Sequence, residues 1–195
     1  MEDKQKKTDR RTLYTRSVVK EAFLALTRTM PYDKINVTTL CKKAEISRAT
    51  FYLHFDNVDD VLNQTIDDAL LFSEEVQGTL LNVLDAAEGK VASGELLLPA
   101  CQRIADSERY HALFMDSLVS SRILHRIAEH EREAVVPGLM ARGNLSRDDA
   151  ELIFRFVLHG SFAVNRSLNW QKNERWHHIQ KLLAKFVTEG MKSVK

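Results

Sequence analysis

Apolar residues recur at intervals of three and four along most of this chain, the spacing that places side chains on one face of an α-helix. Glycine and proline, which interrupt helices, number only 7 and 3 among 195 residues. The pattern predicts an all-α protein with helices over 11–29, within 37–55 as a pair, from 58 onward, and over 100–113, 117–135, 146–169 and 173–192. Residues 78–100 are less regular, Pro137-Gly138 predicts a helix end, and Gly143-Asn144 predicts a turn.

The most informative stretch is 36–62, which reads as two short helices joined by a tight turn. Asn36 directly precedes the first helix, where its side chain can accept a backbone N–H, and Glu45 begins the turn. Ser47 then occupies the cap of the second helix, with Thr50 three residues on. The apolar face of the first helix comprises Val37, Leu40, Cys41 and Ala44.

The second helix presents short or cationic side chains to solvent, namely Arg48, Ala49, Thr50, Tyr52 and His54. Such donors suit base edges and phosphates, which is the arrangement of a helix-turn-helix DNA reader. The fork of the Arg48 guanidinium can pair with guanine O6 and N7, although a phosphate contact or a solvated surface position is also compatible with the sequence. Phe51 and Phe55 are predicted core residues.

The segment Ser47–Phe55, SRATFYLHF, preceded by Leu40–Ala44, LCKKA, resembles the DNA-binding domain of TetR-type (TetR/AcrR) transcriptional regulators. Its aromatic-Tyr-x-His-Phe ending is more specific than a general helix-turn-helix pattern, and the resemblance covers about a quarter of the chain. It implies a three-helix DNA-binding domain over 11–56, after a flexible basic arm at 1–10. It also implies a helical ligand-sensing and dimerisation domain over 57–195.

The resemblance carries Tyr52 and His54 over as phosphate contacts. The first turn of each short helix is expected to face the DNA backbone in the same way. The complete predicted DNA-binding set is Asn36, Thr38, Thr39, Ser47, Arg48, Ala49, Thr50, Tyr52 and His54.

Two positions depart from the family pattern. Glu45 stands where a glycine usually forms the turn, and a left-handed conformation costs a non-glycine residue roughly 1 kcal/mol. Val58 stands where the connecting helix usually opens with a lysine that contacts phosphate. We expect the motif still to bind DNA, with Lys34, Lys42 and Lys43 compensating.

Charge is divided unevenly along the chain, although the net charge is only +1. Residues 1–55 carry 12 Lys and Arg against 6 Asp and Glu, whereas residues 56–195 carry 16 against 21. A basic first quarter on an acidic remainder suits a chain whose N-terminal part meets phosphate. The sequence contains neither a signal peptide nor an apolar run long enough for a membrane span, and it has two distant cysteines, so we expect a cytoplasmic protein.

The resemblance further implies a homodimer formed through the last two long helices, a palindromic double-stranded DNA operator, and repression relieved by a small molecule bound in the C-terminal domain. Small residues at Gly160, Ser161 and Ala163 would permit close helix approach. The residues expected to line the ligand pocket are Phe72, His111, Phe114, Phe162, Asn165 and Trp170. Nothing in the sequence selects a ligand class, and we expect no cofactor.

Enzymatic function is not indicated, because the chain has no glycine-rich phosphate loop, nucleophile elbow or HExxH motif. Two alternatives to a ligand-relieved repressor stay open. One is a helical interaction protein whose head, weakened at Glu45 and Val58, docks a protein partner. The other is a regulator of the same fold that senses metal through His125, Glu129 and His130, or redox state through Cys101; a solvated helix face and an inert buried thiol are favoured over it.

Overall fold

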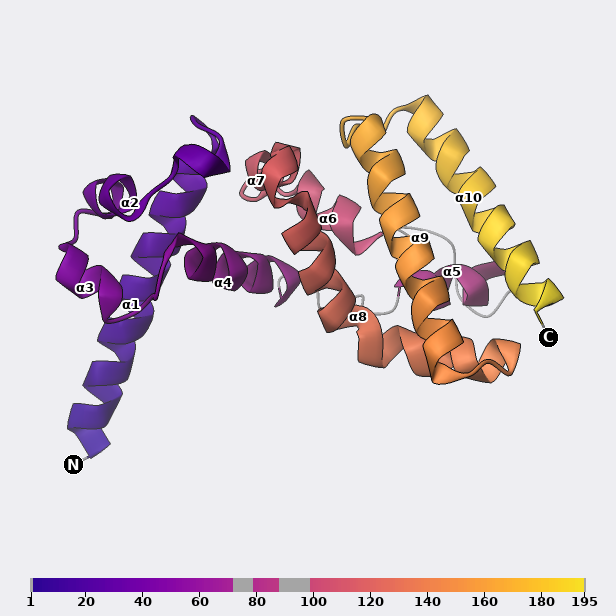
Figure 1. Ribbon diagram of the computed structural model, residues 1–195, viewed down its shortest axis with the longest axis horizontal. Coiled ribbons are helices and arrows are strands. Elements are labelled where there is room, and N and C mark those ends of the chain that lie inside the picture. Colours follow the sequence, from indigo (N-terminus) through magenta and orange to yellow (C-terminus); the bar gives the residue numbers. More distant parts are fainter. Residues whose placement is uncertain (1, 72–78, 88–98, 195) are drawn as a thin grey trace. The chain divides into compact units, whose positions relative to one another are not determined.

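A computed structural model describes residues 2–71, 79–87 and 99–194, with side chains described for 10–71, 80–85, 99 and 101–194. Over these ranges the chain forms helices joined by short links and contains no strand, which confirms the all-α prediction (Figure 1). The described residues form two compact units. The first comprises residues 2–69 and 108–122, and the second comprises the described residues within 70–107 and 123–194.

The first unit begins with α1 (Glu2–Thr27), followed by η1 (Tyr32–Lys34), α2 (Val37–Ala44), α3 (Arg48–Tyr52) and α4 (Val58–Leu71), of which the last two residues belong to the second unit. The helix α1 begins at Glu2, so residues 2–10 are helical where the sequence predicted a flexible arm. No glycine or proline occurs before Pro31, and the charged side chains of this segment are compatible with a helix. The core of this unit includes Phe23, Leu40, Phe51, Phe55, Leu62 and Ile66, all fully buried.

A distant segment completes the first unit. It contains α7 (His111–Met115), η4 (Ser117–Val119) and the first turn of α8 (Ser120–Gly143). The predicted helix over 100–113 is therefore wrong, because the chain is extended at Ser107 (φ −70°, ψ 119°) between α6 (Ala100–Asp106) and α7. The carboxylate of Asp116 accepts the backbone N–H of Leu118 at 2.9 Å, which starts η4 and separates α7 from α8.

The second unit contains α5 (Thr79–Ala87), α6, most of α8, α9 (Arg147–Ser167) and α10 (Glu174–Ser193). Its central cluster consists of Leu84, Val135, Val136, Leu139, Ala150, Phe154 and Met191. Ser146 caps α9, since its hydroxyl accepts the Asp149 N–H at 3.1 Å. Asn144 adopts φ 48° directly after α8, as the predicted turn requires.

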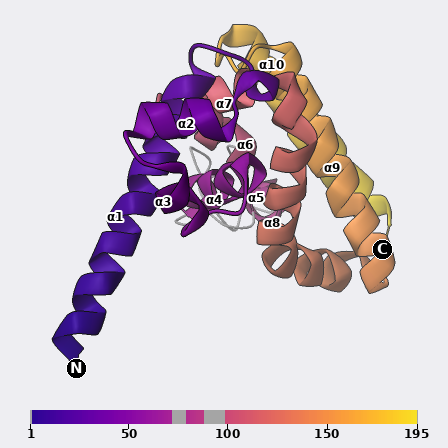
Figure 2. The same ribbon diagram turned by 60° about the vertical axis from the view of Figure 1, so that its left-hand side comes forward.

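Pro137 does not end α8, contrary to the sequence prediction, because the helix continues to Gly143. An interior proline costs roughly 3 kcal/mol, whereas burying each of Val135, Val136 and Leu139 stabilises the helix by about 1.5–3 kcal/mol. The burial therefore outweighs the broken hydrogen bond, and the helix bends along its length instead of stopping (Figures 1 and 2). At Gly138, an added Cβ would lie 2.6 Å from Leu81 Cδ1, so the glycine gives α5 room to pack here.

Within the described ranges, no helix has the length and apolar character needed to cross a bilayer.

Candidate nucleic-acid interface

The first helix of the pair, α2, is fixed by a reciprocal cap at its N-terminus. The side-chain oxygen of Asn36 accepts the Thr39 N–H at 3.0 Å, and the Asn36 N–H donates to the Thr39 hydroxyl at 3.0 Å. These bonds satisfy two backbone donors that a helix start leaves open. The cap predicted from the sequence is confirmed, and it orients the first turn of α2 without help from the rest of the fold.

The turn between the two helices is made by Glu45 in the left-handed conformation, with φ 55° and ψ 39°. The Ile46 N–H donates to the Cys41 carbonyl at 3.1 Å across this turn. Ser47 then caps α3, since its hydroxyl accepts the Thr50 N–H at 3.0 Å. The sequence therefore located both the turn and the cap correctly, and the strain expected at Glu45 is present.

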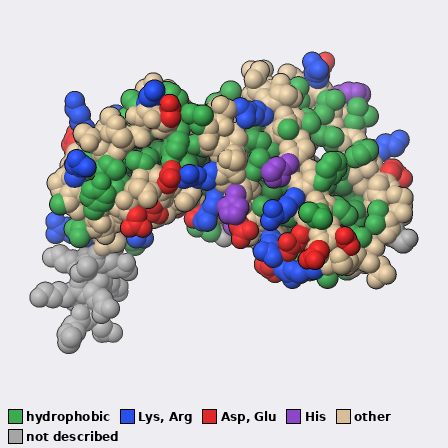
Figure 3. Space-filling model, viewed as in Figure 1, with side chains coloured by type: hydrophobic (Ala, Val, Ile, Leu, Met, Phe, Trp, Pro, Cys, Tyr) green, Lys and Arg blue, Asp and Glu red, His purple; other side chains and the backbone are tan. Residues whose placement is uncertain are grey.

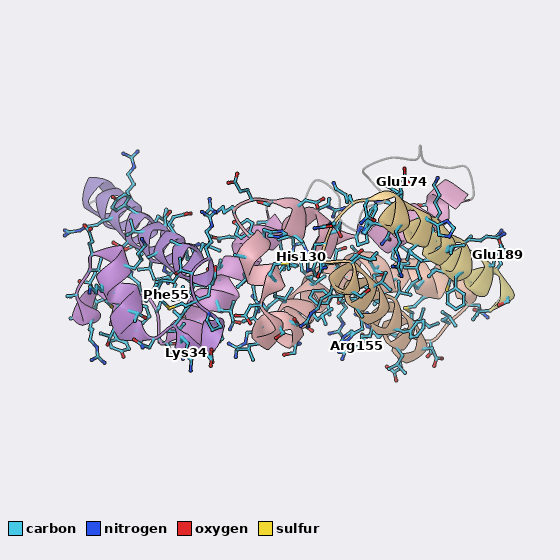
Figure 4. All side chains as sticks on the ribbon, turned by 90° about the horizontal axis from the view of Figure 1, so that it is seen from above. Lys34, Phe55, His130, Arg155, Glu174 and Glu189 are labelled. Atoms are coloured by element: carbon cyan, nitrogen blue, oxygen red, sulfur yellow. The ribbon has the colours of Figure 1, made fainter. Side chains whose placement is uncertain are left out.

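Below the surface, aromatic side chains hold α3 in place. Phe51 and Phe55 are buried, and their stacked rings lie 5.7 Å apart between centroids. Cys41 of α2 is also buried, and burial raises the pKa of its thiol. Because these side chains face inward at helical spacing, the residues between them face outward. Figure 4 shows Phe55 among the helices of the first unit and Lys34 at its edge.

All nine residues predicted to bind DNA lie on the surface of the first unit. Six are exposed and three, Thr39, Thr50 and His54, are half-buried. Tyr52 exposes 52% of its surface although it follows the buried Phe51. Exposed lysines at Lys42 and Lys43 add positive charge to α2. The two helices thus present hydroxyl, phenol, imidazole, guanidinium and ammonium donors from neighbouring turns.

The helix that follows, α4, opens with Val58 where the family pattern would place a lysine, and two acidic residues, Asp59 and Asp60, come directly after it. Asn57 accepts the Asp60 N–H at 2.9 Å and thereby starts the helix. Asp59 accepts a hydrogen bond from the Tyr32 hydroxyl and forms an ion pair with Arg122 at 2.7 Å. The Tyr32 hydrogen bond, followed by the Arg122 interaction, holds the pKa of Asp59 below its usual value. The negative charge at the start of α4 is therefore partly compensated within the unit.

The sequence did not predict that residues 108–122 belong to the first unit, where they contact the N-terminal helices at several points. The Tyr32 N–H donates to the Asp116 carboxylate at 2.7 Å, and the Arg28 guanidinium donates to the Glu108 carbonyl at 3.3 Å. Arg109 also pairs with Glu21 on α1. No periodicity or spacing could have indicated these contacts, because the partners are separated by 80 or more residues.

The residues predicted to line a ligand pocket are distributed over both units. His111 is exposed and Phe114 buried in the first unit, whereas Phe162, Asn165 and Trp170 are buried in the second. Phe72 lies outside the described residues. The second unit contains a cavity of about 220 Å³, and none of the five described residues is on its wall. Residues of α5, α6, α8, α9 and α10 line the cavity instead.

The residues of the metal alternative do not come together as a ligand set. Within the described ranges, no group of three or more His, Cys, Asp or Glu side chains could hold a metal ion. His125 and Glu129 are exposed, and His130 is half-buried with Nδ1 3.7 Å from the Glu131 carboxylate. The redox candidate Cys101 is buried, which raises the pKa of its thiol to about 11 and keeps it protonated.

No protein-family model matches this chain. The uncharacterised HTH-type transcriptional regulator YxbF of Bacillus subtilis (strain 168) is 37% identical over 65 residues, which is 33% of this chain and 17% of that protein. The chain thus spans only a small part of the length of this relative.

Two solved structures are similar over most of the chain. The dihydroxyacetone kinase operon activator DhaS matches with a TM-score of 0.55 and 17% identity, covering 92% of this chain and 97% of that one. The TetR family repressor AlkX from Dietzia sp. strain DQ12-45-1b, implicated in biodegradation of n-alkanes, matches with a TM-score of 0.50, 18% identity and the same coverage. The chain therefore has the all-α fold of a TetR-type transcriptional regulator.

Proposed function

We propose that this protein is a homodimeric DNA-binding transcriptional regulator that represses from a palindromic operator and is released by a small molecule. One observation carries the DNA-binding part of the proposal. The capped helices α2 and α3 bury Leu40, Cys41, Ala44 and Phe51 and leave the nine predicted DNA-binding residues, all within 36–54, at the surface. This is the arrangement by which helix-turn-helix proteins read the major groove.

Within α3, Arg48 and Tyr52 have different roles in the proposal. Arg48 is exposed and lies in the first turn, where its guanidinium can reach a base edge. Tyr52 lies at the end of the helix, and its hydroxyl can donate to a phosphate. Arg48 therefore supplies discrimination between sequences, whereas Tyr52 supplies affinity for any duplex.

Selection of bound duplexes from a random DNA pool at physiological salt tests the proposal directly. The expected result is an enriched inverted repeat with half-sites about 34–36 Å apart, one helical turn of DNA. Arg48→Ala is expected to lose enrichment, and Arg175→Ala is a matched control because Arg175 is exposed at the start of α10. Folded protein that enriches no sequence would refute sequence-specific binding and would favour the interaction-protein alternative.

Dimerisation through α9 and α10 is supported by apolar side chains on the outer faces of both helices. Leu152 and Phe156 of α9 are 66% and 68% exposed, and Leu182 and Phe186 of α10 are 51% and 66% exposed. In each pair the residues are four apart, so they form a stripe on their helix. Figure 3 shows hydrophobic side chains gathered on the part of the second unit where these helices lie. An exposed apolar stripe of this kind is typical of a protein–protein interface.

A single substitution tests this interface. Phe186→Asp places a charge in the centre of the proposed contact and is expected to convert the dimer into a monomer, as measured by light scattering after size-exclusion chromatography. Leu118→Asp serves as the control, because Leu118 is also an exposed apolar residue (58%) but belongs to the first unit and not to α9 or α10. A Phe186→Asp protein that keeps the dimer mass would contradict this interface.

Ligand release is supported by the cavity of about 220 Å³ in the second unit, whose walls include the same helices α9 and α10. A small molecule that binds one arrangement of these helices more tightly than another shifts the protein toward that arrangement. Because α9 and α10 would join the two protomers, the change would alter the separation of the two DNA-reading heads.

A further inference from the structure

The cavity of the second unit has a size that suits a compact molecule. Its volume is about 220 Å³ and most of its wall is aliphatic or aromatic. A dry protein cavity of about 150 Å³ accommodates benzene, which has six non-hydrogen atoms. In the same proportion this cavity accommodates about nine non-hydrogen atoms, which is a compact molecule and not a large drug.

One buried residue, which lies behind the cavity wall, forms hydrogen bonds to two polar side chains on that wall. Asn165 is fully buried, and its side-chain oxygen accepts both the Gln180 amide N–H and the Trp176 indole N–H at 2.9 Å. Its side-chain nitrogen donates to Cys101 Sγ at 3.7 Å. Gln180 and Cys101 line the cavity, whereas Asn165 and Trp176 do not. Asn165, predicted from the sequence as a ligand contact, is therefore a positioning residue for the wall.

This geometry allows Gln180 to change partner at little cost. If a ligand accepts the Gln180 N–H, the Asn165 oxygen still holds the indole N–H of Trp176 and is not left unsatisfied. The exchange therefore creates no buried orphan group on the protein. A ligand without an acceptor gains no such bond, and a ligand with only donors cannot take the Gln180 hydrogen.

The charged groups at the cavity disfavour a charged ligand. Glu131 lines the cavity and is buried, so a ligand carboxylate beside it would face a like charge. Glu131 also interacts electrostatically with Arg103, which compensates its charge, so a cationic ligand would lose its hydration for little attraction in return. Lys181 is on the wall but exposed, and solvent screening leaves such a cation little attraction for an anion.

We infer that the cavity binds an uncharged, mainly apolar molecule of about nine non-hydrogen atoms that carries one hydrogen-bond acceptor for Gln180. This inference rests on the proposed ligand response and names the chemical class of the effector. Ligand binding at Gln180 would also act directly on α9 and α10, because Asn165 lies on α9 and both Gln180 and Trp176 lie on α10.

Three probes with the same eight-carbon chain and different head groups test the class: 2-octanone, octanoate and octylammonium. Both tryptophans of the chain bond to Asn165, Trp176 through its indole N–H and Trp170 through its backbone N–H at 2.9 Å. Binding to DNA-free dimer can therefore be followed by intrinsic fluorescence. The ketone is expected to bind at least tenfold more tightly than either charged probe. Tighter binding of a charged probe, or no saturable binding of the ketone, would overturn the inference.

A pair of variants tests the role of Gln180. Gln180→Met keeps the length of the side chain and removes the donor, and it is expected to weaken ketone binding about fivefold, the usual effect of one net hydrogen bond. Gln171→Met is the control, because Gln171 is exposed in the link between α9 and α10. Circular dichroism checks that both variants fold. Equal ketone affinity in the Gln180→Met variant and the wild type would refute the assigned contact.

The operator obtained by DNA selection separates this inference from the proposed function. Ketone binding with no release of the operator would retain the ligand class and refute ligand-relieved repression. If the protein binds the operator but binds none of the probes, the DNA-binding function is retained and the proposed ligand class is refuted.

Discussion

Replacing Glu45 by glycine tests how much strain the turn of the DNA-binding head contains. Glu45 has φ 55° and ψ 39°, a conformation that costs an L-residue with a Cβ about 1–2 kcal/mol. Glycine removes that cost but adds freedom to the unfolded chain, which offsets roughly 0.4–1 kcal/mol. The Glu45→Gly variant is therefore expected to be more stable by about 0.5–1 kcal/mol. Urea denaturation followed by circular dichroism at 222 nm measures the change.

A second variant separates backbone strain from charge. Glu45 lies at the C-terminus of α2, where a negative side chain faces the negative end of the helix dipole. Glu45→Ala removes the same charge but keeps the Cβ, so the difference between the two variants excludes the charge effect and gives the strain less the added freedom of glycine in the unfolded chain. Equal stability of the alanine and glycine variants would refute the reasoning. Both variants are expected to bind DNA more tightly than the wild type at low salt, because a carboxylate near phosphate has been removed.

Three further predictions concern the surface and the core of the first unit. Arg48→Ala is expected to cost about 1–3 kcal/mol of discrimination at one base-pair position, whereas equal weakening on all sequences, measured by competition binding, would place the side chain on a phosphate. Tyr52→Phe is expected to weaken binding to every duplex by about 1 kcal/mol, and unchanged affinity would exclude a phosphate bond from the hydroxyl. Tyr32→Phe removes the hydrogen bond that, together with Arg122, lowers the pKa of Asp59. A lowered pKa stabilises the fold above the unfolded-state value of about 4 and loses that effect as pH falls through the folded-state value. The melting temperatures of variant and wild type should therefore differ at pH 7 and approach each other as the pH falls below about 4.

Much of the fold follows from contacts between residues three or four apart in the sequence. The caps at Asn36, Ser47 and Ser146 each join a side chain to a backbone N–H three residues on. The burial of Phe51 and Phe55 follows from helical spacing in the same way. Such interactions act within one helical turn, and for this reason the composition, the periodicity and the short motif were sufficient to predict the all-α fold and the surface of α2 and α3.

Tertiary packing decided the features that depend on distant partners. Asp59 is compensated by Arg122, and Tyr32 is bound by Asp116, although each pair is more than 60 residues apart in sequence. Pro137 lies inside α8 because its neighbours are buried. The local preference of proline for helix ends cannot predict this outcome. The sequence identified Asn165 as important, but only the packing of α9 against α10 and α6 places it behind the cavity wall. The physical reason is the same in each case, since the free energy of burial and long-range pairing depends on which helices meet and local propensity does not specify that.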